Sequence, residues 1–117
     1  MTVRSGNVTR LTALDGGITA YGDNATTYTQ VNSSGLTIVD NNVTTGTFNS
    51  TGITLNGAST ADQVVINNTG MTVVSNSVTR LTALDTGVTA YGDAADTYSQ
   101  VSSTGLNVVL DLSLIHI

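Results

Sequence analysis

The stretch that decides the fold runs from residue 35 to residue 55 and reads GLTIVDNNVTTGTFNSTGITL. It contains two short segments, residues 35–39 and 52–55, in which a glycine is followed by apolar residues alternating with threonine. This alternation places apolar side chains on one face of a β-strand and threonines on the other. Residues 40–42, Asp-Asn-Asn, favour a turn. The stretch therefore predicts short strands joined by tight turns.

The same glycine-led segment recurs along the chain, and its spacing alternates between two values that differ by one position. Such regular self-similarity indicates supersecondary units whose apolar faces are covered only by their neighbours. The alternation predicts units of about 17.5 residues that are paired into a 35-residue repeat, with the one-residue difference in a turn or at the start of the second strand. We expect each glycine to mark a bend where a Cβ would clash. The six glycines are Gly17, Gly35, Gly52, Gly70, Gly87 and Gly105.

A longer period lies above this one, because residues 1–39 match residues 71–109 at 27 of 39 positions without a gap. We call this displacement, from residue 1 to residue 71, the long period. Residues 1–110 are therefore interpreted as one tandem β-repeat segment, a fragment of a longer protein. Residues 111–117 lack the Gly/Asn/Thr-rich pattern of the repeats. They are interpreted as a separate tail, either foreign sequence or a short native apolar end. On the first interpretation His116 carries no functional weight.

The composition excludes most enzymatic chemistry. Thr, Gly, Ser and Asn together make up nearly half of the chain, whereas Lys, Glu, Cys, Pro and Trp are absent and there is a single histidine. We therefore predict no enzyme, with no catalytic, cofactor-binding or metal-ligating residues. A net charge of −5 without a basic cluster argues against nucleic acid, and no apolar run is long enough to insert into a membrane. The abundance of Thr and Val favours an all-β fold.

The apolar content is small, with roughly two apolar residues in the first strand of each unit and two or three in the second. Burial at about 25 cal/mol per Å² must offset about 1–2 kcal/mol of backbone entropy per residue, and these small side chains supply little area. Three chains that share one interior would solve this problem, so we expect a homotrimer. The fold class is thus a repetitive fibrous β-structure, either a trimeric β-shaft or a β-solenoid. The expected core residues are Ile18, Leu36, Phe48, Ile53, Ile66 and Met71.

Four phrases carry a resemblance to a known family. They are SSGLTIVDNNV at residues 33–43, STGITLNG at 50–57, NTGMTV at 68–73 and SSTGLNVV at 102–109. They resemble the Gly-apolar-Thr-apolar repeats in the shafts of bacteriophage tail fibres and tail spikes and, more loosely, the adenovirus fibre shaft. The adenoviral repeat is shorter and commonly uses proline at its turns, whereas this chain has no proline.

The resemblance implies a stiff homotrimeric spacer that carries a host-binding tip. It also implies contact with other tail or tip segments of the same protein, and a place in the virion or outside the cell. No catalytic residue is carried over from the family.

Two pairs of charged residues repeat at the long period. Asp23 and Asp93 follow Tyr-Gly and could bind a cation at a trimer axis, but Gly-Asp is also ordinary turn chemistry, and we favour the turn. Arg10 and Arg80 are interpreted as exposed strand residues rather than as ligands.

A column of threonines supports a rival function. These residues would repeat about 4.7–4.9 Å apart if each unit were one coil of a solenoid, which resembles the face of an ice-binding protein. A monomeric Thr-rich β-solenoid that binds ice or another regular surface is therefore an alternative, as is the stalk of a bacterial surface adhesin. The column consists of Thr19, Thr37, Thr54, Thr72 and Thr89.

Overall fold

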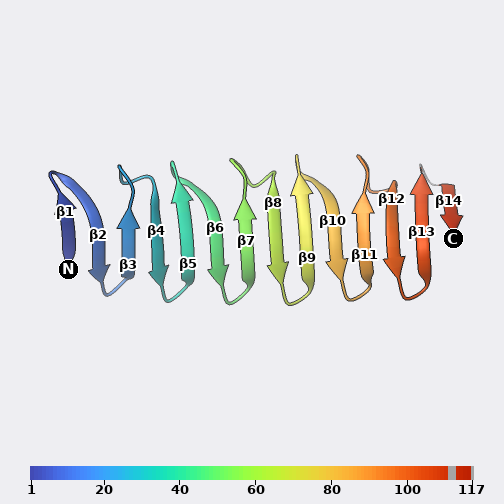
Figure 1. Cartoon of the computed structure of the whole chain (residues 1–117), viewed down its shortest axis with the longest axis horizontal. Coiled ribbons are helices and arrows are strands. Elements are labelled where there is room, and N and C mark those ends of the chain that lie inside the picture. Colours follow the sequence, from blue (N-terminus) through green and yellow to red (C-terminus); the bar gives the residue numbers. More distant parts are fainter. Residues whose placement is uncertain (111–112, 117) are drawn as a thin grey trace. The chain divides into compact units, whose positions relative to one another are not determined.

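The structure is a computed structural model that describes residues 1–110 and 113–116. All regular elements in this part of the chain are strands, and each pairs antiparallel with its partners (Figure 1), which confirms the predicted all-β class. The chain forms two compact units, Met1–Ala58 and Ser59–Ile117. No helix capable of crossing a membrane is present in the described residues.

Over the described residues, each unit is an up-and-down meander of seven strands. The first unit contains β1 (Thr2–Ser5), β2 (Val8–Leu14), β3 (Gly17–Tyr21), β4 (Tyr28–Asn32), β5 (Gly35–Asp40), β6 (Val43–Asn49) and β7 (Gly52–Asn56). The second contains β8 (Gln63–Asn67), β9 (Gly70–Ser75), β10 (Val78–Leu84), β11 (Gly87–Tyr91), β12 (Tyr98–Ser102), β13 (Gly105–Leu110) and β14 (Ser113–His116).

The tail predicted at residues 111–117 is described only in part. Its segment 113–116 is β14, which pairs antiparallel with β13. Residues 111, 112 and 117 lie outside the described residues, and so does the side chain of His116. The distinction between foreign and native sequence in this tail stays a prediction.

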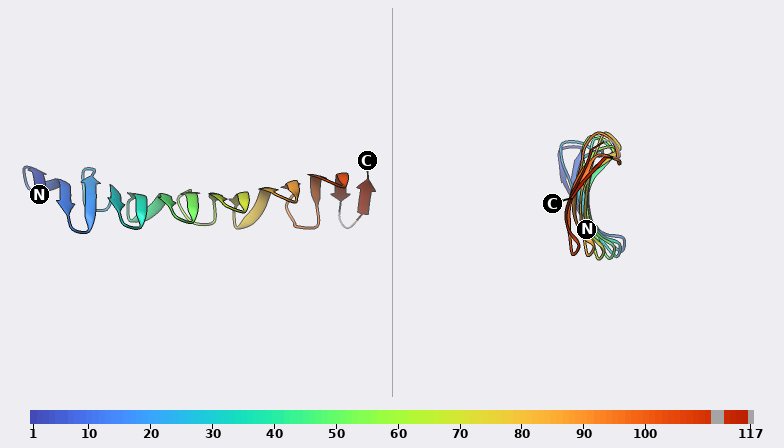
Figure 2. Two further views of the ribbon diagram at one scale, coloured as in Figure 1. Left: turned by 90° about the horizontal axis from the view of Figure 1, so that it is seen from below. Right: turned by 90° about the vertical axis from the view of Figure 1, so that its right-hand side faces the viewer.

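Each unit is a single layer of strands. Within a unit, a strand contacts only the strands before and after it in the chain, and Figure 2 shows the ribbons edge-on without a second layer. No side chain in the described part of the chain is fully buried. The small apolar content seen in the sequence therefore corresponds to an open sheet rather than to an enclosed core.

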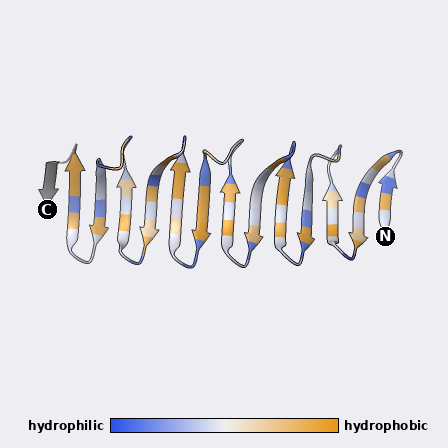
Figure 3. Ribbon diagram, turned by 180° about the vertical axis from the view of Figure 1, so that it is seen from behind, coloured by the Kyte–Doolittle hydropathy of each residue, from blue (hydrophilic) through white to orange (hydrophobic). Residues whose placement is uncertain are grey.

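The strand register gathers the residues next to the repeated glycines into one continuous line across each unit, which we call the apolar row. Its members pair directly with one another on adjacent strands, and the expected core residues all belong to it. The hydropathy colouring of the strands is shown in Figure 3. The apolar row consists of Ala13, Ile18, Val31, Leu36, Phe48 and Ile53 in the first unit, and of Ile66, Met71, Ala83, Val88, Val101 and Leu106 in the second.

The opposite face carries a second line, the threonine row, because successive residues of a strand point to opposite faces. The five predicted threonines fall in this row together with their partners on the intervening strands. The threonine row consists of Thr12, Thr19, Gln30, Thr37, Thr47 and Thr54 in the first unit, and of Val65, Thr72, Thr82, Thr89, Gln100 and Asn107 in the second.

The alternating spacing of the glycines has a structural cause at the strand ends opposite to them, which we call the loop edge. Between Gly17 and Gly35, two five-residue strands are joined by a six-residue loop, residues 22–27. Between Gly35 and Gly52, strands of six and seven residues are joined by the two-residue turn Asn41-Asn42. The second arrangement is one residue shorter, as the sequence predicts.

The turns differ in chemistry as well as in length. Asn41 and Asn42 have φ values of 47° and 64°, the conformation of the type I′ turn that suits a two-residue hairpin. The predicted turn at Asp40-Asn41-Asn42 is therefore confirmed. At the opposite strand ends, which we call the glycine edge, Asn49 Oδ1 accepts the backbone N–H of Thr51 at 2.9 Å, an Asx turn that leads into Gly52.

Each seven-residue strand contains a β-bulge at the same position of the 35-residue repeat. The register of β6 against β5 shifts between Gly46 and Thr44, so Thr45 has no partner opposite it. The same shift leaves Arg10 in β2 and Arg80 in β10 without partners on β1 and β9. Because a bulge redirects the side chain of its extra residue, these three positions leave the alternation of the two faces.

The repeated glycines are required where a strand begins, and Gly35 shows why. Its φ is +121°, which side chains rarely tolerate, and a Cβ at this position would overlap the carbonyl oxygen of Phe48. Gly17, Gly70 and Gly87 have the same conformation and the same conflict with the neighbouring strand. The predicted clash is thus confirmed at these positions, although it occurs with the paired strand.

We expect Gly35→Ala to lower the free energy of unfolding by about 1–3 kcal/mol, because the substitution combines backbone strain with the loss of close strand approach. Gly16→Ala is the matched control, since a Cβ at Gly16 has nothing within 4 Å. Its effect should stay within about 0.5 kcal/mol. Urea unfolding followed by circular dichroism measures both values. Equal midpoints for the two variants would contradict this account of the glycine edge.

Candidate functional site

Much of the apolar row is uncovered in the single chain. Phe48 is 59% exposed, Ile18 is 53% exposed and Ile66 is 43% exposed. The other expected core residues, Leu36, Ile53 and Met71, are partly exposed. The structure therefore brings the predicted residues of each unit into one row, but it does not bury them within the single chain.

The threonine face is the better covered of the two. Thr19 and Thr89 are only 6% and 4% exposed, and Val39 on the same face is 5% exposed. Gln30 lies opposite Thr19 on the next strand and donates from Nε2 to the Thr19 hydroxyl at 3.1 Å. Gln100 makes the same bond to Thr89 in the second unit. These two predicted threonines are thus engaged within the sheet rather than presented to solvent.

Two tyrosine pairs lie on this face beside the threonine row. Tyr21 is directly opposite Tyr28, with ring centroids 5.9 Å apart and planes tilted by 53°. Tyr91 and Tyr98 repeat this arrangement at 6.0 Å in the second unit. Tilted pairs at such distances contribute about 0.5–1.5 kcal/mol beyond their burial, so each pair steadies the strands that flank a six-residue loop.

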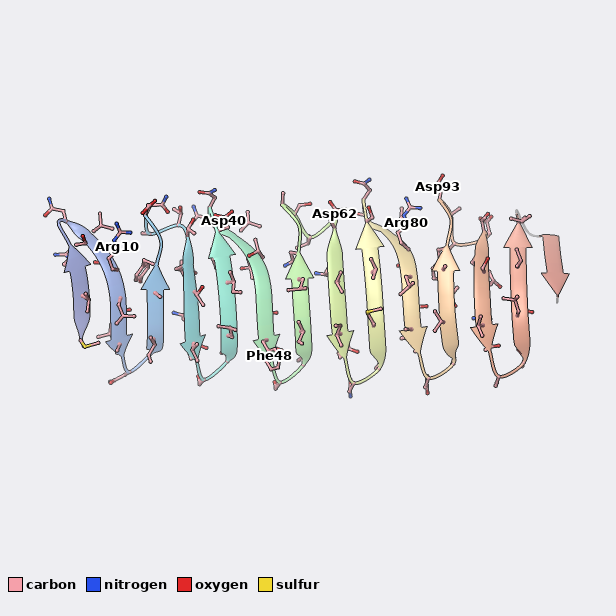
Figure 4. All side chains as sticks on the ribbon, viewed as in Figure 1. Arg10, Asp40, Phe48, Asp62, Arg80 and Asp93 are labelled. Atoms are coloured by element: carbon pink, nitrogen blue, oxygen red, sulfur yellow. The ribbon has the colours of Figure 1, made fainter. Side chains whose placement is uncertain are left out.

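The arginine at a β-bulge of each unit forms hydrogen bonds to that six-residue loop. Arg10 Nη1 donates to the carbonyl oxygen of Gly22 at 2.6 Å and to Asp23 Oδ1 at 3.2 Å. Arg80 does the same in the second unit, at 2.7 Å to Gly92 and 2.9 Å to Asp93. Figure 4 labels both arginines near the loop edge.

Each predicted cation candidate therefore has a cationic partner already. Among the described residues, no three His, Cys, Asp or Glu side chains are grouped so that they could hold a metal. The interpretation of Asp23 as part of a turn is consistent with its position in the loop 22–27.

The loop 22–27 also forms hydrogen bonds to the turn Asn41-Asn42, which is the next connection at this edge of the sheet. The backbone N–H of Asn42 donates to the carbonyl of Thr26 at 2.8 Å, and that of Asn41 donates to the Thr27 hydroxyl at 3.1 Å. The Thr27 hydroxyl in turn donates to Asp40 Oδ1 at 3.1 Å. The loop edge is thus a connected network of polar groups rather than a set of independent turns.

Four residues form a set that sequence reasoning treated separately. Arg10, Tyr21, Asp23 and Tyr28 recur one long period later as Arg80, Tyr91, Asp93 and Tyr98. In the intervening 35-residue repeat all four are replaced, by Thr45, Asn56, Ala58 and Gln63. The joint loss of the arginine and the aspartate was the signal in the sequence that could have revealed their pairing.

No family model matches this chain, and neither a curated protein nor a solved structure shows significant similarity to it. Arguments about its function therefore rest on the two faces of the sheet and on the loop edge.

We expect Arg10→Met to loosen the loop 22–27 more than Asp23→Ala does. The arginine variant loses a bond to a backbone carbonyl, whereas the aspartate variant loses only an ion pair with a fully exposed carboxylate. We expect about 1 kcal/mol less protection of the loop amides in Arg10→Met, measured by hydrogen exchange. The loop 92–97 serves as the internal control and should not change. A larger effect in Asp23→Ala would show that the ion pair, and not the carbonyl bond, holds the loop.

Proposed function

We propose that this chain is a structural, non-enzymatic segment of a β-shaft, in which copies of the chain cover one another's apolar rows. The shaft is homotrimeric and belongs to a phage tail fibre or tail spike, where it acts as a stiff spacer for a host-binding tip. The observation that carries the proposal is the uncovered apolar row of a one-layer sheet.

The energetic argument follows from exposure. Full burial of one Val, Leu, Ile or Phe side chain contributes about 1.5–3 kcal/mol, and monomeric proteins rarely leave large contiguous apolar patches in water. Phe48, Val31 and Val101 are each more than half exposed in the single chain. Three copies related by a three-fold axis can cover these side chains, because each copy then contacts the next through the same pair of surfaces and the ring closes.

The number three and the assignment to a virion rest on the resemblance of the repeats to phage shafts. Three rows that meet on one axis would each contribute one narrow apolar stripe, which suits a row built mostly from one residue per strand. A bacterial adhesin stalk would use the same sheet in the same way and would differ in the protein that the shaft carries.

A second candidate is a monomer that binds ice or another regular surface through the threonine row. The feature that favours it is the alignment of Thr37, Thr47 and Thr54 on three neighbouring strands, which lie about 4.7–4.9 Å apart. The low exposure of Thr19 and its bond to Gln30 count against it. Thermal hysteresis in a freezing assay would support this candidate over the shaft.

The mass in solution tests the proposal. One chain weighs 12.0 kDa, so a trimer has a mass of about 36 kDa. We expect Phe48→Asp and Ile66→Asp to abolish association, because an unpaired carboxylate buried between chains costs several kcal/mol. Thr44→Asp is the matched control, since Thr44 is exposed on the opposite face of the same strand as Phe48. Sedimentation of the wild type as a folded 12.0 kDa particle, or of the Phe48 variant as a trimer, would refute the shaft.

A further inference from the structure

The Arg-Tyr-Asp-Tyr set is not needed to build the meander. β5, β6 and β7 form the same antiparallel pairs as β1, β2 and β3, and the repeat to which they belong has none of the four residues at the equivalent positions. The glycines and the apolar row, by contrast, continue through every repeat. The four residues are present together or absent together, and the strands pair in the same way in both cases. The set therefore has a role besides building the strands.

Two members of each set, the first tyrosine and the aspartate, line a hollow beside the six-residue loop. In the first unit the hollow has a volume of about 660 Å³ and is walled by β1, β2, β3 and the loop, including Thr9, Thr12, Tyr21 and Asp23. In the second unit a hollow of about 510 Å³ lies at the equivalent position. All nine lining positions of one hollow correspond to those of the other, displaced by one long period. Volumes of this size are typical of sites for small ligands.

We propose that these two hollows bind saccharides, each taking a sugar ring against its tyrosine. The lining joins one aromatic ring to several hydroxyl groups and one carboxylate, and it carries no unpaired cation. A tyrosine has an apolar ring face and a polar tip, and threonine hydroxyls both donate and accept hydrogen bonds. A sugar offers the complementary surface, because its ring has an apolar C–H face and a rim of hydroxyl groups.

The arginine acts as a positioning residue in this site. Arg10 Nη1 is bonded to Gly22 and to Asp23 Oδ1, which leaves the second oxygen of the fully exposed Asp23 carboxylate open to a ligand hydroxyl. Its charge is balanced by this carboxylate, so the site does not favour an anion. A metal ion is likewise disfavoured, since the carboxylate already faces a cation.

The two sites are not identical, and the difference predicts their order of affinity. The first hollow includes Asn7 and Asn24, whereas the second has Ser77 and Ala94 at these positions. Asn7 adds an amide with two donors and an acceptor, whereas Asn24 adds only two amide donors, because its Oδ1 already accepts the backbone N–H and the hydroxyl of Thr26. These groups suit neighbouring sugar hydroxyls. We therefore expect the first hollow to bind more tightly than the second.

The site lies on the face opposite to the apolar row, because Thr12 and Tyr21 share the face of the threonine row. Association through the apolar row would therefore leave both hollows accessible. Saccharide binding and the mass in solution are separate measurements, so failure of either leaves the other intact.

The test is a titration of the full chain with methyl glycosides of glucose, galactose, mannose and N-acetylglucosamine, followed by NMR of the tyrosine rings and the loop amides. We expect at least one glycoside to give saturable shifts at Tyr21 and, more weakly, at Tyr91. Tyr21→Leu should weaken binding at the first hollow by about tenfold or more and leave the second unchanged, and Tyr91→Leu should do the reverse. Each variant thus contains its own folding control.

A gain-of-function variant separates binding from a structural role. Ser77→Asn with Ala94→Asn should raise the affinity of the second hollow toward that of the first, which improved folding alone would not do. The proposal is overturned if no glycoside shifts the signals of either hollow, or if the shifts survive in the Tyr21→Leu and Tyr91→Leu variants.

Discussion

The register of the strands is the constraint on which the rest of this structure depends. A slip of one residue would move every apolar side chain to the threonine face and every threonine to the apolar face. The tight turns at the glycine edge prevent this slip, since the glycine at the start of a strand approaches the neighbouring backbone where a Cβ would overlap a carbonyl oxygen. The bulge at Thr45 and its equivalents then absorbs the one extra residue of each long strand without changing the faces.

A fixed register also determines what the protein presents to its surroundings. Residues such as Ile18, Leu36 and Phe48 form a line because each is paired with the next through an intervening strand or directly. In a globular domain a second layer would cover such a line, but within each unit the described strands contact only the strands before and after them in the chain. The sheet therefore has an uncovered apolar face and a polar face, and the proposed association and the proposed saccharide sites lie on different faces.

The loop edge shows how a repeat protein can vary without losing its fold. The pairing of Arg10 with Gly22 and Asp23 is present in alternate 35-residue repeats and replaced in the one between them. The shared positions maintain hydrogen-bonded strands and turns, which every repeat needs. The variable positions lie around the six-residue loops, where insertions and substitutions cost the sheet little.

The sequence alone determined the strands, the glycine bends and the 35-residue period, because these depend on contacts between residues close together in the chain. Alternation of apolar residues with threonine is a local signal, and so is the turn at Asn41 and Asn42. Only the tertiary structure decided that the strands form an open meander, since the same alternation suits a solenoid coil. It also decided that Arg10 reaches Asp23 and that Tyr21 meets Tyr28, because these contacts depend on loop length, on a bulge and on the pairing of neighbouring strands, none of which a local pattern specifies.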